Sequence, residues 1–245
     1  AGLNAWGVAD GRAWSHVLPG CRSVLVFASG GSVLWDALIA DLKTNPRHLS
    51  EEDHPLDAFI TRTLHQIDPE PGESRRWIRC SADEPNPVDF RPLAQDAGLG
   101  WRSMLGLLIH PHFGPWLGLR AACFTTDLLP VSGPLSGEGP CPDCPAPCIS
   151  ACPGDALKRP SGPLGELGGW DVGVCSRFHQ LSNLCDTQCH SRRSCPEGFE
   201  HRYSEAQQRY HYNRKIGRRE LAEALGISDA REGVGPFWGS WSEED

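Results

Sequence analysis

The chain lacks three features that would each assign it to a broad class of protein. No run of about eighteen apolar residues occurs among its 245 residues, so we expect no membrane-spanning segment. Its first residues, AGLNAWGVADGR, lack a basic start followed by an apolar stretch, so they predict no signal peptide and favour a reducing, cytoplasmic setting. The net charge is -8, which argues against nucleic acid as the default partner, because phosphate backbones require basic surface.

Cysteine, by contrast, is plentiful and unevenly placed. Eight of the eleven cysteines lie between Cys141 and Cys195, and an odd total cannot pair completely within one chain. In a reducing compartment such patterns bind metal more often than they form disulfides. From about Pro134 to Gly198, glycine and proline dominate and apolar periodicity is slight. This segment can hardly build a core of its own, so we expect a metal framework to hold it.

The spacing of these cysteines is typical of an iron–sulfur protein. The stretch CPDCPAPCISACP reads C-x2-C-x3-C-x3-C-P, one residue longer than the bacterial ferredoxin run, whose fourth cysteine ligates the other cluster. Downstream, a lone cysteine precedes a C-x3-C-x5-C-P group. Crossed ligation predicts two 4Fe–4S clusters, one held by Cys141, Cys144, Cys148 and Cys195 and the other by Cys152, Cys175, Cys185 and Cys189. Zinc and disulfides are the alternatives, although the downstream group has no C-x2-C knuckle for zinc.

Outside this segment short strands and helices alternate, which predicts a mixed α+β layer domain. Strands are expected over 21–29 and 75–80 and in the two apolar runs beside PHFGPW, and helices over 32–43, 55–67 and 89–97. Ser204 and Gln207 have the spacing of a capping box, and Gly226 marks the end of the helical pattern that follows. Regular structure therefore returns after the cysteine-rich segment.

The stretch RPLAQDAGLGW, followed by an apolar strand and the two-cluster segment, resembles epoxyqueuosine reductase, a cobalamin-dependent iron–sulfur enzyme that reduces a modified tRNA base. The resemblance runs from about Asp83 to Cys195, and the cluster cysteines match in order. It implies that Asp83 or Glu84 is the acidic proton donor. Two departures argue against tRNA as a partner: Ser103 and Met104 replace a Gly-Lys pair, and the helical-repeat extension is missing.

Three further stretches resemble the cblC-type proteins, which remove the upper axial ligand of incoming cobalamins. They are LPGCRSVLVFASGGSVLWDAL, GLLIHPHFGPWLGLRAACF and RYSEAQQRYHYNRKIGRRELAEALG, and they bracket the cysteine segment. Both families share a nitroreductase-like α+β architecture. The resemblance implies a nitroreductase-like cobalamin-binding domain (1–133) with an inserted bacterial-ferredoxin-like two-cluster module (134–200), a C-terminal helix (201–226) packed on the first domain, and an acidic tail (227–245).

A corrinoid needs a flat apolar cleft for its ring and donors for its amide and phosphate fringe. Small, aromatic and imidazole residues suited to this role are His110, His112, Phe113, Gly114, Trp116 and Gly118, joined by Gly98, Gly100 and Trp101. The alternative is that the first group forms a hairpin that merely packs. In that case the earlier glycines only stop a helix and make a turn.

Two arginines complete the predicted cofactor site. Arg120 and Arg218 match arginines that bind glutathione in the cblC-type family, although a helical arginine such as Arg218 is more often solvated. Residues 191–220 carry eight Lys and Arg against four Asp and Glu. This basic stretch is either a solvated helix face or a dock for an anion, such as the cobalamin phosphate, glutathione or an acidic ferredoxin.

The leading hypothesis from these residues is an iron–sulfur reductase that binds base-off cobalamin. Electrons would pass from an external donor, such as a ferredoxin, a flavodoxin or glutathione, through both clusters to cobalt, and the upper axial ligand would leave. The alternatives are a dicluster electron carrier without corrinoid chemistry and reduction of a modified tRNA nucleoside. No D-x-H-x-x-G run is present to supply a histidine in place of the lower base. Cys21, Cys80 and Cys123 are expected to be small buried apolar residues.

Overall fold

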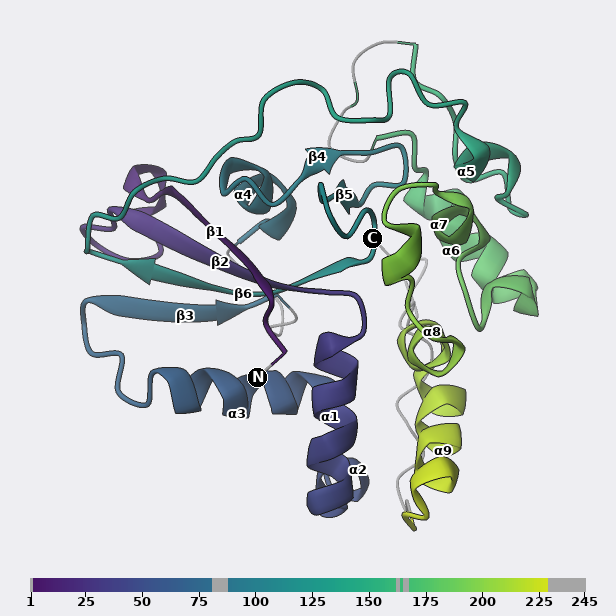
Figure 1. Cartoon of the computed structure of the whole chain (residues 1–245), viewed down its shortest axis with the longest axis horizontal. Helices are drawn as coiled ribbons and strands as arrows, with labels where there is room; N and C mark the ends of the chain where they lie inside the picture. The colour runs from purple at the N-terminus through teal and green to yellow at the C-terminus, as the bar shows by residue number, and fades with distance from the viewer. Residues whose placement is uncertain (1, 81–87, 162–163, 165–167, 229–245) are drawn as a thin grey trace, which may run out of the picture.

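A four-stranded antiparallel sheet forms the centre of the computed structural model, which describes residues 2–80, 88–161, 164 and 168–228 (Figure 1). The strand order is β1 (Ala5–Asp10), β2 (Ser23–Gly30), β6 (Leu117–Thr125) and β3 (Arg75–Arg79). On β2, Val24, Val26 and Ala28 all point to one face and are completely buried. This period of two explains why the apolar run at 21–29 forms a strand.

Helices pack on both faces of the sheet. On one face α4 (Phe90–Asp96) packs against Val24 and Val26, and the side chain of Asp89 caps this helix by accepting from the Arg91 amide. On the other face a second core joins β6 to the helices α1 (Val33–Thr44), α2 (Arg47–Ser50), α3 (Pro55–Ile67) and α9 (Arg214–Leu225). The expected apolar stripe of α3 is buried at Leu56, Ile60 and Leu64.

The predicted C-terminal helix over 201–226 is wrong in one respect, because it is broken into α8 (Glu205–Tyr212) and α9. Asn213 separates the two helices and caps α9 by accepting from the Ile216 amide at 3.1 Å. A Cβ at Gly217 would overlap the backbone of Tyr210, so the glycine lets the two helices cross closely. The ends are as expected: Ser204 caps α8, and Gly226 adopts the left-handed conformation.

The cysteine-rich segment lies at one end of the molecule, beside α8 (Figure 1). Its helices are short: α5 (Pro147–Ser150), α6 (Val172–Leu181) and α7 (His190–Ser194). The 3-10 turns of the chain are η1 (Arg12–Trp14), η2 (Asn183–Cys185) and η3 (Phe199–His201). A third core joins this segment to the small sheet formed by β4 (Trp101–Arg102) and β5 (Leu108–Ile109). The segment therefore shares its core with the domain that precedes it.

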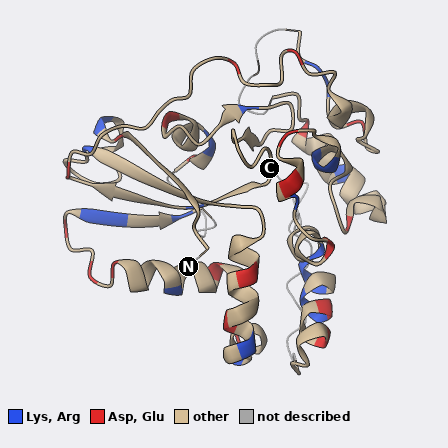
Figure 2. Cartoon of the chain, viewed as in Figure 1, with Lys and Arg blue, Asp and Glu red and all other residues tan. Residues whose placement is uncertain are grey.

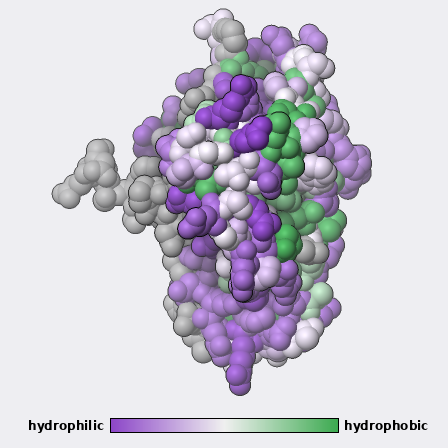
Figure 3. Space-filling view, turned by 90° about the vertical axis from the view of Figure 1, so that its left-hand side faces the viewer, coloured by the Kyte–Doolittle hydropathy of each residue, from purple (hydrophilic) through white to green (hydrophobic). Residues whose placement is uncertain are grey.

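One face of the molecule carries both polar and apolar surface. Figure 3 shows hydrophobic side chains gathered along one side of that view, beside mostly hydrophilic ones. Among large hydrophobic residues, Trp6 on β1 is 62% exposed, and Leu128 and Val131 after β6 are also exposed. Both basic and acidic residues lie along α9 (Figure 2). Within the described ranges no helix combines the length and the apolar character needed to cross a bilayer.

Candidate functional site

All eleven cysteines are described and all are free thiols, so the disulfide alternative has no support in the structure. Four of them, which we call group I, line one small pocket with about 380 Å³ of empty space, part of it open to solvent. Group I consists of Cys141, Cys144, Cys148 and Cys195. The pocket wall is largely apolar and includes Met104, Leu105 and Ile109 of the shared core. Thiols from two ends of the cysteine segment therefore meet at one hollow.

The other four cysteines, group II, lie close enough for the charge of one thiol to affect the protonation of another. Group II consists of Cys152, Cys175, Cys185 and Cys189. Burial, followed by the negative charges that the other three thiols can carry, raises the pKa of Cys185 to about 12. Burial likewise raises the pKa of Cys195 in group I to about 11. Buried, crowded thiols stay protonated until a cation replaces the protons, which is the situation of metal ligands before loading.

Backbone amides already point at three of these sulfur atoms. The amide of Ala146 donates to Cys144 Sγ at 3.4 Å, and the amide of Ala156 donates to Cys152 Sγ at 3.3 Å. Cys189 is the N-cap of α7, and its Sγ accepts from the Arg192 amide at 3.5 Å. Amide donors of this kind stabilise anionic sulfur and tune cluster potentials in iron–sulfur proteins.

The thiols are not arranged around a single ion. In the described part of the chain, no three His, Cys, Asp or Glu side chains converge in a way that would hold one metal ion. Zinc places its sulfur ligands about 2.3 Å from one centre, hence roughly 4 Å from each other. A cubane distributes its ligands over four irons, so its thiols lie farther apart. Iron–sulfur ligation of the two groups therefore remains a prediction, with zinc as its alternative.

The loop predicted to contact a corrinoid packs instead against η3. His110 Nδ1 accepts from the amides of His112 and Phe113, at 3.0 and 3.2 Å. The rings of His112 and His201 lie 4.2 Å apart, and Phe113 packs 4.9 Å from His201. A Cβ at Gly114 would overlap the Glu197 carbonyl. This close packing is that of the hairpin in the alternative interpretation, and contact of these residues with a corrinoid remains a prediction.

The earlier glycines also serve packing. Gly98 has a φ of +75° at the end of α4 and lies against the backbone of Gly133. A Cβ at Gly100 would meet the Ile109 carbonyl. Trp101 covers Gly139 and donates its Nε1–H to the Ser136 carbonyl at 3.1 Å. These residues form a helix stop and a turn, and their contact with a cofactor remains a prediction.

Two predicted cofactor contacts, Gly118 and Arg120, lie together on β6. The register between β2 and β6 shifts between Phe27 and Ala28, which leaves Arg120 as the extra residue of a β-bulge. Bulges redirect a side chain, and the half-buried Arg120 guanidinium passes close over Gly118 and donates from Nε to Ser29 Oγ at 2.9 Å. Arg120 therefore remains a candidate for contact with an anion.

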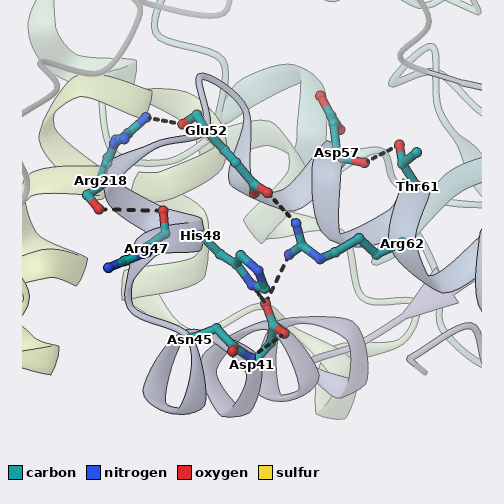
Figure 4. Close-up of polar contacts among 10 residues, drawn as sticks. Asp41, Asn45, Arg47, His48, Glu52, Asp57, Thr61, Arg62 and Arg218 are labelled. Carbon is teal, nitrogen blue, oxygen red and sulfur yellow. Dashed lines mark hydrogen bonds and ion pairs between the residues drawn. The ribbon is translucent and has the colours of Figure 1, made fainter.

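Arg218 has a structural role, and its contact with an anion remains a prediction. Its side chain is buried, with 3% of the residue exposed. Nη1 donates to the Glu52 carbonyl at 2.8 Å (Figure 4), and Nη2 donates to the Leu49 carbonyl. In the same view Arg62 lies between the carboxylates of Asp41 and Glu52. Arg218 thus fastens α9 to the end of α2.

Replacing Arg218 with alanine is expected to lower the free energy of unfolding by about 3 kcal/mol, because buried carbonyls lose their donors. The measurement is chemical unfolding followed by circular dichroism. Arg219→Ala is the matched control, since Arg219 is the next residue of α9 and is exposed; a change within about 0.5 kcal/mol is expected there. Equal losses in both variants would contradict the assignment.

Protonation of His110 is expected to destabilise the fold in acid. Burial, together with His112 and His201, lowers the pKa of His110 to about 4. The unfolded chain binds this proton more readily, so stability falls as the pH drops from about 6.5 towards 4. Relative to wild type, His110→Asn should lose about 2 kcal/mol less between pH 7 and pH 4.5, as measured by urea unfolding. Parallel pH profiles for the two proteins would contradict this prediction.

The two predicted catalytic acids, Asp83 and Glu84, lie outside the described residues. In sequence they follow β3, whose last residue, Arg79, lines a polar hollow with about 1000 Å³ of empty space, much of it open to solvent. The hollow is also lined by His48, Glu52, Asp53, His54, Asp57, Ala58, Thr61 and Arg62. This is the largest of the hollows described here, and its lining is mostly charged.

Several basic side chains of the stretch 191–220 contact other residues of the protein. Arg209 pairs with Glu220 at 2.8 Å, and Arg202 lies 4.3 Å from the Phe199 ring. Arg192, which sequence reasoning did not single out, contacts both Trp116 and Tyr203. The only signal for it was its place in a basic run three residues after Cys189. The prediction of an anion dock along this stretch therefore finds little support.

Comparison with known proteins matches the chain to epoxyqueuosine reductases, although no protein-family model matches it. The enzyme of Synechococcus sp. (strain RCC307) is 31% identical over 172 residues, which are 68% of this chain and 48% of that protein. The Gloeobacter violaceus enzyme is 28% identical over 202 residues, 74% of this chain and 57% of that protein. The chain thus spans about half the length of the curated relatives it matches.

Solved structures share the mixed α/β architecture. A selenomethionine-labelled epoxyqueuosine reductase superimposes with a TM-score of 0.51 at 14% identity, covering 95% of this chain and 74% of that chain. The catabolic reductive dehalogenase NpRdhA gives 0.53 at 17% identity, covering 93% and 32%. The B12-trafficking protein CblC of C. elegans gives 0.48 at 11% identity, covering 91% and 88%, which is too low to assign the chain to that family. These identities show the fold alone, and the nitroreductase-like description and the domain division stay predictions.

Proposed function

We propose that the chain is a two-cluster iron–sulfur reductase that works with a corrinoid, and that it reduces a modified nucleoside of the epoxyqueuosine type. One observation supports this most strongly: eight free thiols form two groups of four in a chain whose matched relatives are epoxyqueuosine reductases. Group I would hold one 4Fe–4S cluster and group II the other. Group I takes three cysteines from the first run and one from the downstream set, and group II takes one and three, as crossed ligation requires.

The proposed reaction is the deoxygenation of an epoxide. Both C–O bonds break, a carbon–carbon double bond forms, and the oxygen leaves as water after taking up two electrons and two protons. The clusters would deliver the electrons from an external donor one at a time, and a bound corrinoid would supply the low-potential chemistry at the substrate. Asp83 or Glu84 is the proposed proton donor, and Arg120 the proposed contact for an anionic group.

Transfer RNA becomes the proposed carrier of the substrate, in place of the sequence-based expectation against it. The relatives that the chain matches are named for a nucleoside substrate. The net charge of -8 indicates that backbone contacts would be few, so we expect weak, salt-sensitive binding. Removal of the upper ligand of cobalamin is the second hypothesis, and it rests on the sequence resemblance to cblC-type proteins.

The test uses protein purified without oxygen, supplied with hydroxocobalamin and a chemical reductant. We expect conversion of an epoxyqueuosine-containing tRNA stem-loop to the deoxygenated nucleoside, detected by mass spectrometry, and dependence on cobalamin. The same protein with cyanocobalamin tests the second hypothesis. Cluster-loaded protein that binds no cobalamin, or that releases cyanide but leaves the nucleoside unchanged, would overturn the proposed function.

A further inference from the structure

One arginine connects group II to the sheet domain. Arg192 lies on α7 three residues after Cys189, and its amide donates to Cys189 Sγ. Its side chain extends out of the cysteine-rich segment and donates from Nε and Nη2 to the Pro115 carbonyl, at 3.1 and 2.7 Å. A single residue therefore touches a group II sulfur and the segment just before β6, the strand that carries the bulge at Arg120.

The guanidinium of Arg192 lies between two aromatic rings. Its Cζ is 4.6 Å from the centre of the Trp116 ring and 4.7 Å from that of Tyr203. Trp116 is fully buried, and the rings of Trp116 and Tyr203 contact each other at 5.3 Å. This stacking suits arginine, which is planar, weakly hydrated and always charged, and would not suit lysine equally well.

The charge of Arg192 affects the pKa of two neighbouring side chains, Tyr212 and His211. Burial and the negative charge that Cys189 can carry raise the pKa of Tyr212, and Arg192 opposes that rise. Burial, then Arg120 and Arg192, hold the pKa of His211 well below its usual range. The neutral form of Tyr212 is favoured, so its hydroxyl supplies no negative charge to balance the arginine.

Among the residues that the structure describes, the contacts of Arg192 include no carboxylate. A carbonyl oxygen, two rings and tyrosine hydroxyls carry only partial charges. A partly buried cation without a counter-ion carries a desolvation cost. Thiolates that hold an iron–sulfur cluster would supply the missing negative charge, because the cluster with its four thiolates is anionic and gains a further negative charge on reduction.

We propose that Arg192 is the counter-charge of the group II cluster and raises its reduction potential. This inference rests on the proposed function in one respect, the presence of the cluster. A nearby cation stabilises the more negative, reduced form, so its removal makes the cluster harder to reduce. Arg192 is a positioning residue: it acts on the cluster through Cys189 and through its charge.

The experiment compares potentials in three variants by redox titration with EPR detection under nitrogen. Arg192→Met removes the charge and keeps a long apolar side chain, whereas Arg192→Lys keeps the charge. Arg193→Met is the matched control, because Arg193 is the next residue of α7, carries the same charge and accepts from Arg202 through its backbone carbonyl. We expect the group II potential to fall in Arg192→Met and to stay near wild type in the other two.

Every other outcome of this experiment either supports or overturns the proposal. Loss of the group II cluster in Arg192→Met with retention in Arg192→Lys supports the proposal, since charge alone then rescues binding. An unchanged potential in Arg192→Met, an equal shift in Arg193→Met, or loss of the cluster in both Arg192 variants overturns it while leaving the proposed function intact. Wild-type protein that binds no iron would overturn both.

Discussion

Replacing Cys195 with alanine is expected to remove about half of the bound iron and acid-labile sulfide and to abolish reductase activity. Cys195 lies 43 residues after Cys152 along the chain, yet it lines the group I pocket with Cys141, Cys144 and Cys148. Its loss leaves one cluster with three ligands, while group II keeps four. Iron and sulfide analysis with EPR of the dithionite-reduced protein measures this directly.

The matched control is Cys123→Ala. Cys123 is buried in β6, belongs to neither group and pairs with Leu25 and Trp77 across the sheet. Its burial raises its pKa to about 12, as expected of an inert structural thiol. Full iron content is expected in this variant. If Cys195→Ala keeps all its iron, or if both variants lose iron equally, the assignment of Cys195 to group I is wrong.

The second large effect is expected at Gly114, where alanine should lower the thermal midpoint by at least about 6 °C. Gly114 has a φ of +55°, which costs a side chain about 1–2 kcal/mol. Its Cβ would also overlap the Glu197 carbonyl, and movement there displaces the nearby Cys195. We therefore expect group I iron to fall as well, measured on the same anaerobic sample by iron analysis and differential scanning calorimetry.

Gly72→Ala separates backbone strain from overlap. Gly72 has a similar φ of +62°, but a Cβ there meets nothing within 4 Å. About 1 kcal/mol of destabilisation and no loss of iron are expected. A Gly114→Ala protein that is no less stable than Gly72→Ala would contradict the close packing of the loop against residues 197–201.

The periodic parts of the fold could be predicted from the sequence, and the crossings between them could not. The stripe of Leu56, Ile60 and Leu64 predicted α3, and Asp89 predicted the start of α4. The break at Asn213 was missed because the residues on both sides favour a helix. What decides the break is the close approach of Gly217 to Tyr210, a tertiary contact that no local pattern encodes.

For the candidate site, too, features set by local spacing could be predicted and contacts between distant parts of the chain could not. Fixed cysteine spacings predicted which thiols the structure would bring together, because short loops leave few arrangements. The packing of the histidine and glycine loop could not be predicted, since its partner, Gly198, lies far along the chain, and glycines suit a tight contact as well as a ligand cleft. Arg192 escaped notice for a similar reason: Trp116 and Tyr203 become its neighbours only through folding.

The central claim is that two groups of four thiols each bind a cubane cluster. Iron, sulfide and zinc analysis of wild-type protein purified without oxygen, with EPR of the reduced sample, tests it most directly. The account predicts about eight iron and eight sulfide per chain and signals from two interacting 4Fe–4S clusters. Stoichiometric zinc, or a protein free of metal, would contradict it.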